Sequence, residues 1–504
     1  MTLIILTVTF FICLGYSVYQ HFTKFNDYWI RKKVRGPKPT FFFGNIMDSV
    51  LRKKPVGVVF KEIYDAYPDE KVVGFFRMRS PDLLVRDLDV VKCVLIKDFH
   101  IFTDRGKEFS KSGFGANLFH ADSATWRVLR KRFSPMFTSG KLRNMMYLLT
   151  ERGDRFVKYI DRITQKNTEQ EIHGLTQKFT QSVIIACVFG LDLDTFDDQQ
   201  HETLQALQWI DKKIFSVKYG SELESMYPGI LKKIGGWFLD EEVKKFFSKL
   251  IKDVIAMRNG QPSNRHDFMD LLLELKKEYG HGQSEANTLD MTDEDIAAQA
   301  YIFYAAGYES SASTMGFLLY QLALNQDIQE KLYEEIKEAL ERTALDGEMT
   351  YYAIMNLSYM EKVFNETLRM YPIITKLKRR AKTSYKIPET DITIDKGQLI
   401  KISVLGIHHD EKYYPNPEVF DPERFSPENV QARHKCAFLP FGEGPKQCIG
   451  IRFAQMQSWV GLAKLLHRYR VEPSGNTPHR FTYEPTRVVL YPKDGFPINI
   501  VRRE

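Results

Sequence analysis

The sequence predicts a mainly α fold with a small β portion, preceded by an N-terminal transmembrane helix. Three observations lead to this prediction. Residues 88–345 mostly show helical spacing, short stretches between residues 72 and 86 read as strands, and residues 2–23 contain no Asp, Glu, Lys or Arg. With 504 residues, of which 43% are hydrophobic and 27% charged, the chain can form a large core and has an ordinary globular composition.

Residues 2–23 are expected to form an uncleaved membrane anchor. At about 1.5 Å per residue, such a helix covers roughly the hydrocarbon thickness of a bilayer. Five basic residues follow it between Lys24 and Arg35 and none precedes it, so the positive-inside rule places the rest of the chain on the cytoplasmic side. A cleaved signal peptide, the alternative, would show a basic start and a small-residue cleavage site, and neither is clear. Residues 24–39 are expected to be a basic, proline-containing linker, and residues 40–504 a single domain.

The β portion is expected in two places. Residues 72–78 and 82–86 predict short strands on either side of a Ser-Pro turn. Residues 392–394 and 399–404 flank Asp395–Gly397, a pattern typical of a hairpin.

Two helices are marked by clear boundary signals. Thr292 and Asp295 form a capping-box-like start, and no proline follows before about Asn325, so one helix of some thirty residues is expected there. A second helix is expected to end at Tyr371, because Pro372 disfavours helical backbone in the residue before it.

The cysteines and the net charge exclude several classes of protein. An odd number of scattered cysteines without C-x-x-C spacing argues against a disulfide scaffold or a zinc site and favours a reducing compartment. The net charge of +7 is modest and both signs are interspersed, so it does not indicate nucleic-acid binding. The cysteines are Cys13, Cys93, Cys187, Cys436 and Cys448.

Cys448 lies in the glycine-rich loop FGEGPKQCIG, residues 441–450, directly before a helix-compatible run. Gly442, Gly444 and Gly450 allow the backbone to approach a flat cofactor, and main-chain N–H groups can hydrogen-bond the sulfur. The start of the following helix adds partial positive charge, which is expected to lower the pKa of the thiol and favour the thiolate. The alternative is a buried structural cysteine in a turn-rich loop.

The predicted long helix contains the segment AAGYES, residues 305–310. Gly307 costs about 1 kcal/mol of helix propensity relative to alanine, and the expected compensation is room for a ligand against the helix backbone. Glu309 and Ser310 are an acid and a hydroxyl suited to organising water and relaying protons. Ser310 can also bond back to a carbonyl and distort the helix. A solvated glutamate and a serine packed at a helix–helix contact are the alternative.

Two further sets of side chains combine charge with helical spacing. Glu366 and Arg369 are three residues apart on one helical face, and Arg424 could complete a charge cluster with them. Trp126 and Arg130 are four residues apart, so their donor groups project from one face. Solvated ion pairs and a half-buried tryptophan are the alternatives.

Together these motifs resemble those of microsomal cytochrome P450 enzymes, and insect xenobiotic-metabolising members in particular. The loop at residues 441–450 resembles the haem-binding loop of that family, and AAGYES resembles its oxygen-activating segment. Residues 126–141 resemble its haem-edge helix, and the E-x-x-R pair with the Pro422–Phe425 segment resembles its structural triad. These motifs occur in the family's order from about residue 35 to the end of the chain.

The resemblance implies the cytochrome P450 fold, bound haem b (iron protoporphyrin IX) and a role for each matching residue. Cys448 would be the axial thiolate ligand of the iron, and Glu309 and Ser310 would deliver protons. The residues implied to bind the cofactor are Cys448, Trp126, Arg130, Arg379, Phe441, Gly444, Lys446 and Gly450, of which Trp126, Arg130, Arg379 and Lys446 would face the propionates. The implied structural residues are Glu366, Arg369 and Arg424. The implied substrate-pocket residues are Phe114, Phe119, Ala305, Ala306, Ile374 and Val488.

Two positions depart from the family pattern. Ser310 stands where the family usually has threonine; the hydroxyl is kept but the β-methyl that restrains its rotamer is lost, so less efficient proton delivery is expected. Lys446 stands where the family usually has arginine; the charge is kept but the bidentate fork is lost, so looser propionate anchoring is expected.

The resemblance also implies a monooxygenase that inserts one oxygen atom of O2 into small apolar substrates. These would be xenobiotics such as plant toxins or insecticides, or endogenous lipids or hormones. Electrons would come from NADPH through a separate NADPH–cytochrome P450 reductase, with cytochrome b5 as a further candidate donor, because the chain has no convincing dinucleotide or flavin fingerprint. The enzyme would lie on the cytoplasmic face of the endoplasmic reticulum membrane, held by one anchor. Candidates for reductase docking are Arg127, Lys131, Arg132, Lys435 and Arg452.

Two other classes stay open. One is a haem-thiolate isomerase or dehydratase that works without O2 and reductase; the acid–hydroxyl pair of Glu309 and Ser310 speaks against it. The other is a non-catalytic, membrane-tethered binding protein, against which the complete set of ligand and proton-relay residues argues.

Overall fold

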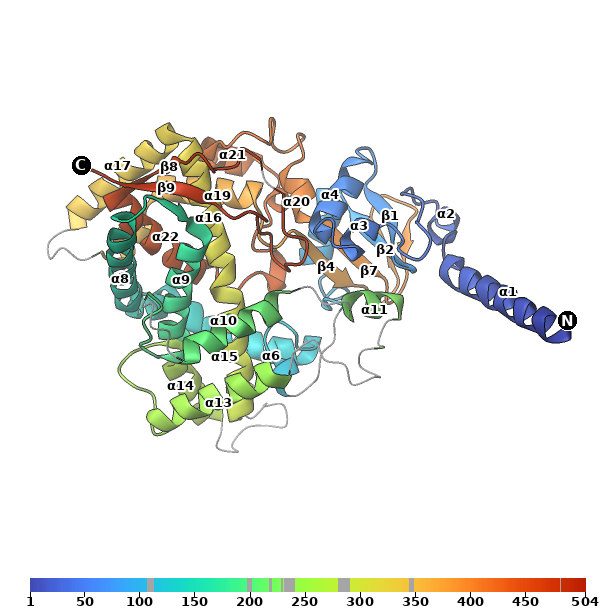
Figure 1. The fold of residues 1–504 in the computed structure, drawn as a ribbon, viewed down its shortest axis with the longest axis horizontal. Coiled ribbons are helices and arrows are strands. Elements are labelled where there is room, and N and C mark those ends of the chain that lie inside the picture. Colours follow the sequence, from blue (N-terminus) through green and yellow to red (C-terminus); the bar gives the residue numbers. More distant parts are fainter. Residues whose placement is uncertain are drawn as a thin grey trace.

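The protein has a helical body with a smaller sheet region, and a single helix projects from the sheet end (Figure 1). This computed structural model describes residues 1–106, 113–196, 202–216, 220–227, 230, 241–279, 291–343, 349–480 and 482–504. The projecting helix, α1 (Thr2–Thr23), carries the N-terminus, and the C-terminus lies on the far side of the helical body. The predicted fold class, mainly α with a small β portion, is confirmed.

Helices form most of the described chain and enclose the larger apolar core. After α1 they are α2 (Tyr28–Arg31), α3 (Met47–Val50), α4 (Val56–Asp65), α5 (Leu88–Lys92), α6 (Ser123–Phe133), α7 (Ser139–Asn144), α8 (Met146–Thr164), α9 (Ile172–Ile184), α10 (Glu202–Phe215), α11 (Gly220–Met226), α13 (Glu241–Met257), α14 (Phe268–Tyr279), α15 (Asp293–Gly307), α16 (Glu309–Leu324), α17 (Gln326–Thr343), α18 (Tyr351–Met355), α19 (Ser358–Met370), α20 (Val404–His408), α21 (Pro427–Ala432) and α22 (Ile451–Arg468). The end of α19 confirms the boundary predicted before Pro372.

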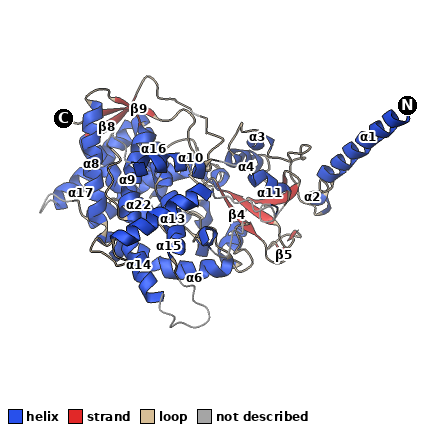
Figure 2. Cartoon of the chain, turned by 60° about the horizontal axis from the view of Figure 1, so that its bottom comes forward, coloured by secondary structure: helices blue, strands red, loops and turns tan. Residues whose placement is uncertain are grey.

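The strands gather in two regions, one near α1 and one near the C-terminus (Figure 2). A four-stranded sheet has the order β1-β2-β7-β4, in which only the β2–β7 pair is parallel. A second sheet has the order β3-β9-β8, and β5 pairs with β6. The strands are β1 (Val72–Arg77), β2 (Ser80–Val85), β3 (Glu169–Glu171), β4 (Lys376–Arg380), β5 (Tyr385–Lys386), β6 (Thr393–Ile394), β7 (Leu399–Ser403), β8 (Tyr469–Pro473) and β9 (Pro497–Arg502).

One strand prediction is confirmed and the other is wrong. β1 and β2 form the expected pair, and it is antiparallel. The turn was predicted at the wrong place: it falls at Met78 and Arg79, because Ser80 and Pro81 already belong to β2 and pair with β1. The expected hairpin across Asp395–Gly397 does not form, because β6 pairs with β5 while β7 lies between β2 and β4. Ile400 and Ile402 of β7 are fully buried, so this strand is stabilised in the centre of a sheet with neighbours on both sides.

The predicted thirty-residue helix is two helices. Thr292 caps α15 together with Asp295 in the expected capping box, but the helix ends at Gly307 and α16 begins at Glu309. Tyr308 separates them. The interruption falls inside the AAGYES segment, where the hydroxyl of Ser310 donates a 2.6 Å hydrogen bond to the carbonyl of Ala306.

α1 is long and apolar enough to cross a membrane, and none of its residues is buried against the domain. The segment after it does not behave as a free linker. Trp29 is buried and donates from Nε1 to the carbonyl of Phe75, 3.1 Å away, and Val34 is also buried. The indole occupies the space beside Gly74 of β1, where a Cβ would come within 2.4 Å of the ring. Much of residues 24–39 is therefore part of the folded domain.

Candidate active site

The loop that carries Cys448 folds back on itself before α22 begins. The amide of Cys448 donates to the carbonyl of Phe441 at 2.9 Å, and a short 3₁₀ turn spans Gly444–Lys446. Gly444 has a φ of +76°, and a Cβ there would lie 2.1 Å from the carbonyl oxygen of Leu95. Only glycine fits this backbone, because a side chain would both strain φ and collide with the backbone of Leu95.

The thiol of Cys448 is exposed, yet protein surrounds it closely enough to desolvate it. Desolvation raises the pKa of this thiol, and a hydrogen bond from the backbone of Gly450 and the charges of Arg130 and Arg105 offset that rise only in part. The expected lowering of the pKa by the loop and helix start is therefore wrong for the thiol alone, because loss of water outweighs those partial charges. A metal ion bound to the sulfur would still favour the thiolate, because its positive charge is in direct contact with the sulfur atom.

Four basic side chains gather around this loop, and one of them was not predicted. Arg105 donates to the carbonyl of Lys446 at 3.2 Å, and Arg130 donates to the carbonyl of Gln447 at 2.9 Å. Arg379 and Lys446 are 3% and 6% exposed. Within the described part of the chain, none of the four forms an ion pair with a carboxylate. Arg105 is the residue that was not predicted, because it lies in none of the motifs found in the sequence.

Burial and mutual repulsion make this cluster a strong anion site. Burial and then the charge of Arg105 lower the pKa of Arg379 to about 9, and burial with the charges of Arg105 and Arg379 lowers that of Lys446 to about 7. The Lys446 ammonium lies 4.6 Å from the centre of the Trp126 ring, which holds it by a cation–π contact. Desolvated cations that have no carboxylate partner among the described residues, beside an exposed thiol, fit a cofactor that carries both a thiolate-binding metal and carboxylates.

At the break between α15 and α16, the side chains of Ser310 and Glu309 face different sides of the helix. Ser310 lies one helical turn from exposed Ala306, whereas Glu309 is fully buried against α9. Gln457 of α22 donates to the carbonyl of Gly307 at 3.1 Å, so the helix after Cys448 supports the interruption. The space beside Gly307 is filled by Ile184 of α9, whose Cδ1 would lie 2.6 Å from a Cβ. Gly307 therefore allows α9 to pack closely against the helix on this side.

The charge cluster expected around Glu366 is present. Arg369 donates to both oxygens of Glu366, from Nε at 2.7 Å and from Nη2 at 2.8 Å, and both side chains are fully buried. Arg424 lies 3.5 Å from the same carboxylate, and the amide of Asp421 donates to it at 3.0 Å. Arg369 also donates to the carbonyls of His408 and Pro417. The cluster thus ties α19 to residues 408–424, which lead toward the cysteine loop.

The candidate substrate-pocket residues divide into two groups. Phe114 and Ala305 are buried in the core, where Phe114 packs on Tyr301. The other four are exposed: Phe119, Ala306, Ile374 and Val488. The segments that carry Ile374 and Val488 lie side by side, because the amide of Leu490 donates a 3.0 Å hydrogen bond to the carbonyl of Ile373.

The candidate docking residues also divide. Arg127, Lys131, Lys435 and Arg452 are exposed. Arg132 is only 7% exposed, so it cannot belong to an open basic surface and this prediction is wrong. Arg132 lies on the same helix as Trp126 and Arg130, but its side chain packs inward.

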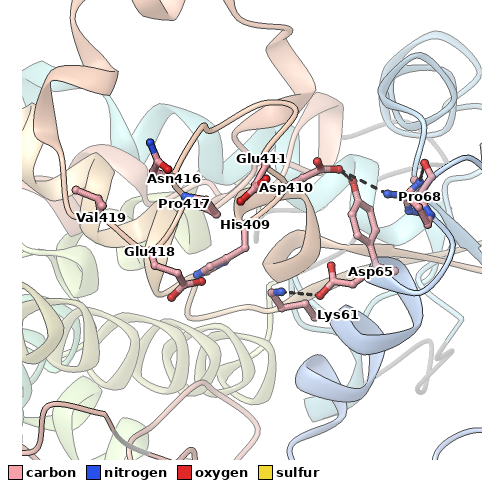
Figure 3. Close-up of a pocket in the computed structure, with 12 residues that line it drawn as sticks. Lys61, Asp65, Pro68, His409, Asp410, Glu411, Asn416, Pro417, Glu418 and Val419 are labelled. Carbon is pink, nitrogen blue, oxygen red and sulfur yellow. Dashed lines mark hydrogen bonds and ion pairs between the residues drawn. The ribbon is translucent and has the colours of Figure 1, made fainter.

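A polar surface cleft of about 640 Å³ lies elsewhere, between α4 and residues 409–419 (Figure 3). Several of its polar groups pair with one another: Lys61 pairs with Asp65 at 2.6 Å, and the hydroxyl of Tyr64 donates to Asp410 at 2.7 Å. None of the residues of the candidate active site lines it.

Known proteins are similar to this one over nearly the whole chain. A family model described as cytochrome P450 matches residues 34–499. The chain belongs to the cytochrome P450 family. Among its relatives, cytochrome P450 6B1 of Papilio polyxenes is 52% identical over 96% of this chain and 97% of its own length. Cytochrome P450 6B6 of Helicoverpa armigera is 49% identical over 97% and 96%. Cytochrome P450 6a8 of Drosophila melanogaster is 35% identical over 97% and 96%. This P450 is accordingly a monooxygenase with haem as its cofactor.

Proposed function

We propose that this P450 oxidises small apolar xenobiotics, such as plant toxins or insecticides. The observation that carries the chemistry is the exposed thiol of Cys448 beside four basic side chains without carboxylate partners in the described chain. The apolar substrate is supported by the exposed side chains of Phe119, Ile374 and Val488. The same side chains would accept endogenous lipids or hormones, which form the second substrate class.

In this proposal Cys448 Sγ binds the haem iron, and Arg105, Arg130, Arg379 and Lys446 bind the propionates. Haem ligated by a thiolate supplies the chemistry that cleaves the O–O bond. Trp126 positions Lys446 through the cation–π contact, which offsets the missing arginine fork. Phe441, Gly444 and Gly450 give the loop its shape.

Protons are proposed to reach the oxygen-binding side of the broken helix through Ser310 and Glu309. The hydroxyl of Ser310 lies on the side of Ala306 and would order water there. Glu309 would pass the proton from behind the break, and its side chain must turn away from α9 to deliver it. An isomerase or dehydratase would need neither group in this place, which is why we favour the monooxygenase route over that second candidate.

We further propose that α1 anchors the enzyme in the endoplasmic reticulum membrane, with the domain on the cytoplasmic side. The basic residues after α1 support this orientation. A separate reductase would pass electrons from NADPH, with cytochrome b5 as a further donor. Exposed Arg127, Lys131, Lys435 and Arg452 are the proposed docking residues.

The test uses the full-length enzyme in phospholipid vesicles with reductase, NADPH and O2. Apolar compounds are first screened for displacement of the haem-bound water by the change in the haem spectrum, and the compounds that bind are then assayed for oxygenated product. Product that requires NADPH, O2 and reductase together is the expected result. Turnover of a hydroperoxide without NADPH or O2 would instead establish the isomerase or dehydratase.

A further inference from the structure

Glu309 belongs to a buried polar network that extends away from Ser310. Its Oε1 lies 3.5 Å from Nε2 of His173 on α9, and its Oε2 accepts a 2.6 Å hydrogen bond from Gln177. Apart from this contact with His173, Oε1 has no hydrogen-bond partner among the described residues. Burial raises the pKa of Glu309, but the charge and hydrogen bond of His173 and the bond from Gln177 outweigh it and hold the pKa below its usual value. The acid is therefore held ionised on the α9 side.

A second carboxylate, Asp211 of α10, interacts electrostatically with both members of this pair. Its Oδ1 accepts a hydrogen bond from the hydroxyl of Tyr308, the residue between α15 and α16. Its Oδ2 lies 3.4 Å from Arg487. Burial and the charge of Glu309 raise the pKa of Asp211 to about 6, although Arg487 and His173 lower it. Of the two carboxylates, Asp211 is the one that can hold a proton near neutral pH.

Exposure increases stepwise along the network. The side chain of Glu309 is 0% exposed and that of His173 is 2%, whereas Asp211 is 15% and Arg487 is 22% exposed. The charged and titratable groups that face Asp211 come from four parts of the chain. They are Glu309 from α16, His173 from α9, Tyr304 and Tyr308 from α15 and the break after it, and Arg487 and Tyr491 from residues 482–496. Asp211 is thus the carboxylate of this network that meets solvent.

We propose that Asp211 is the solvent-side proton carrier for Glu309, and that His173 and Arg487 position the two carboxylates. A proton from water binds an oxygen of Asp211, moves through ordered water to Oε1 of Glu309, and is replaced on Asp211 from solvent. Both carboxylates return to their starting state after each transfer. This inference rests on the proposed role of Glu309 as the proton donor of the active site.

The test compares Asp211→Asn with Asp161→Asn. Asp161 is a matched control, because it also accepts a hydrogen bond from a tyrosine, Tyr469, and pairs with an arginine, Arg468, at 3.4 Å. In Asp211→Asn the carbon monoxide spectrum of the reduced enzyme should stay normal. Product formation should fall roughly tenfold, the solvent isotope effect should rise, and more of the O2 consumed should be released as peroxide. Asp161→Asn should match wild type, and Asp211→Glu should restore most of the loss.

A second readout does not depend on turnover. Infrared difference spectra of the resting enzyme should show a carboxyl group that titrates near pH 6 in wild type and is missing in Asp211→Asn. If wild type shows no such group, the proposal is overturned even where the variant does not fold. Glu309→Gln separates the two claims. If Glu309→Gln is impaired and Asp211→Asn is not, the path through Asp211 is wrong while the role of Glu309 stands; if neither is impaired, both are wrong.

Discussion

The change Glu366→Gln tests whether the buried charge cluster holds the fold around the cysteine loop. In the native protein the Glu366 carboxylate accepts two hydrogen bonds from Arg369, at 2.7 and 2.8 Å, and one from the amide of Asp421. Glutamine keeps one acceptor oxygen but turns an NH2 group toward the guanidinium. Arg369, which is fully buried, then lacks its anion.

The expected loss is large because the remaining charge cannot reach water. Removing one partner of a buried ion pair costs about 3–5 kcal/mol, out of a total stability of roughly 5–15 kcal/mol. Burial already raises the pKa of Glu366 despite Arg369, which shows how little solvent screens this site. We expect the urea midpoint followed by tryptophan fluorescence to fall sharply, and the fraction of protein that takes up haem to fall with it.

Glu423→Gln is the matched control for this change. Glu423 pairs with Lys331 at 2.9 Å and Lys362 at 2.7 Å, but its side chain is 48% exposed. Surface pairs contribute about 0–1 kcal/mol, so this variant should unfold almost as wild type does. The reasoning is refuted if Glu366→Gln loses less than about 1 kcal/mol, or no more than Glu423→Gln does.

Two further predictions concern the sheet and the cysteine loop. Burial lowers the pKa of Lys401, beside Asp82, to about 7 in the folded protein. Above that pH the unfolded chain keeps a proton on this lysine that the folded protein has lost. The free energy of unfolding should therefore rise with pH, by about 1 kcal/mol between pH 7 and 8. Lys401→Met should remove this rise in urea titrations at the two pH values, and an equal slope in the variant would contradict it. Gly444→Ala should sharply reduce haem content, measured by absorbance per protein, because its Cβ meets the carbonyl of Leu95. Gly475→Ala, with open space around it, should bind haem normally, and equal haem content in both variants would show that the loop tolerates a side chain.

Local patterns predicted the parts of the site that depend on local geometry. The i, i+3 spacing of Glu366 and Arg369 places both on one helical face, and the contact follows from that spacing alone. The capping box of Thr292 and the pairing of β1 with β2 likewise need only neighbouring residues. Ser310 bonds back to a carbonyl as its side-chain chemistry allows.

Features that depend on distant segments were missed or wrongly predicted. β7 pairs with β2, more than three hundred residues earlier, and no local turn signal contains that information. Arg105 joins the cation cluster only because β4 and the cysteine loop pack beside it, and Asp104 is already bridged to Arg380 of β4. The pKa of Cys448 depends on how far the whole domain excludes water, which outweighs the helix start that the loop sequence shows. Ile184 likewise fills the space beside Gly307 from another helix.

The central claim is that Cys448 is the thiolate ligand of the haem, and one spectrum tests it directly. The full-length enzyme and its Cys448→Ala variant are reduced with dithionite and exposed to carbon monoxide. Wild type should show the long-wavelength Soret band of a thiolate-ligated haem, and the variant should lack it while its urea midpoint stays near that of wild type. A normal band in the variant, or its absence in wild type that contains haem, would contradict the account.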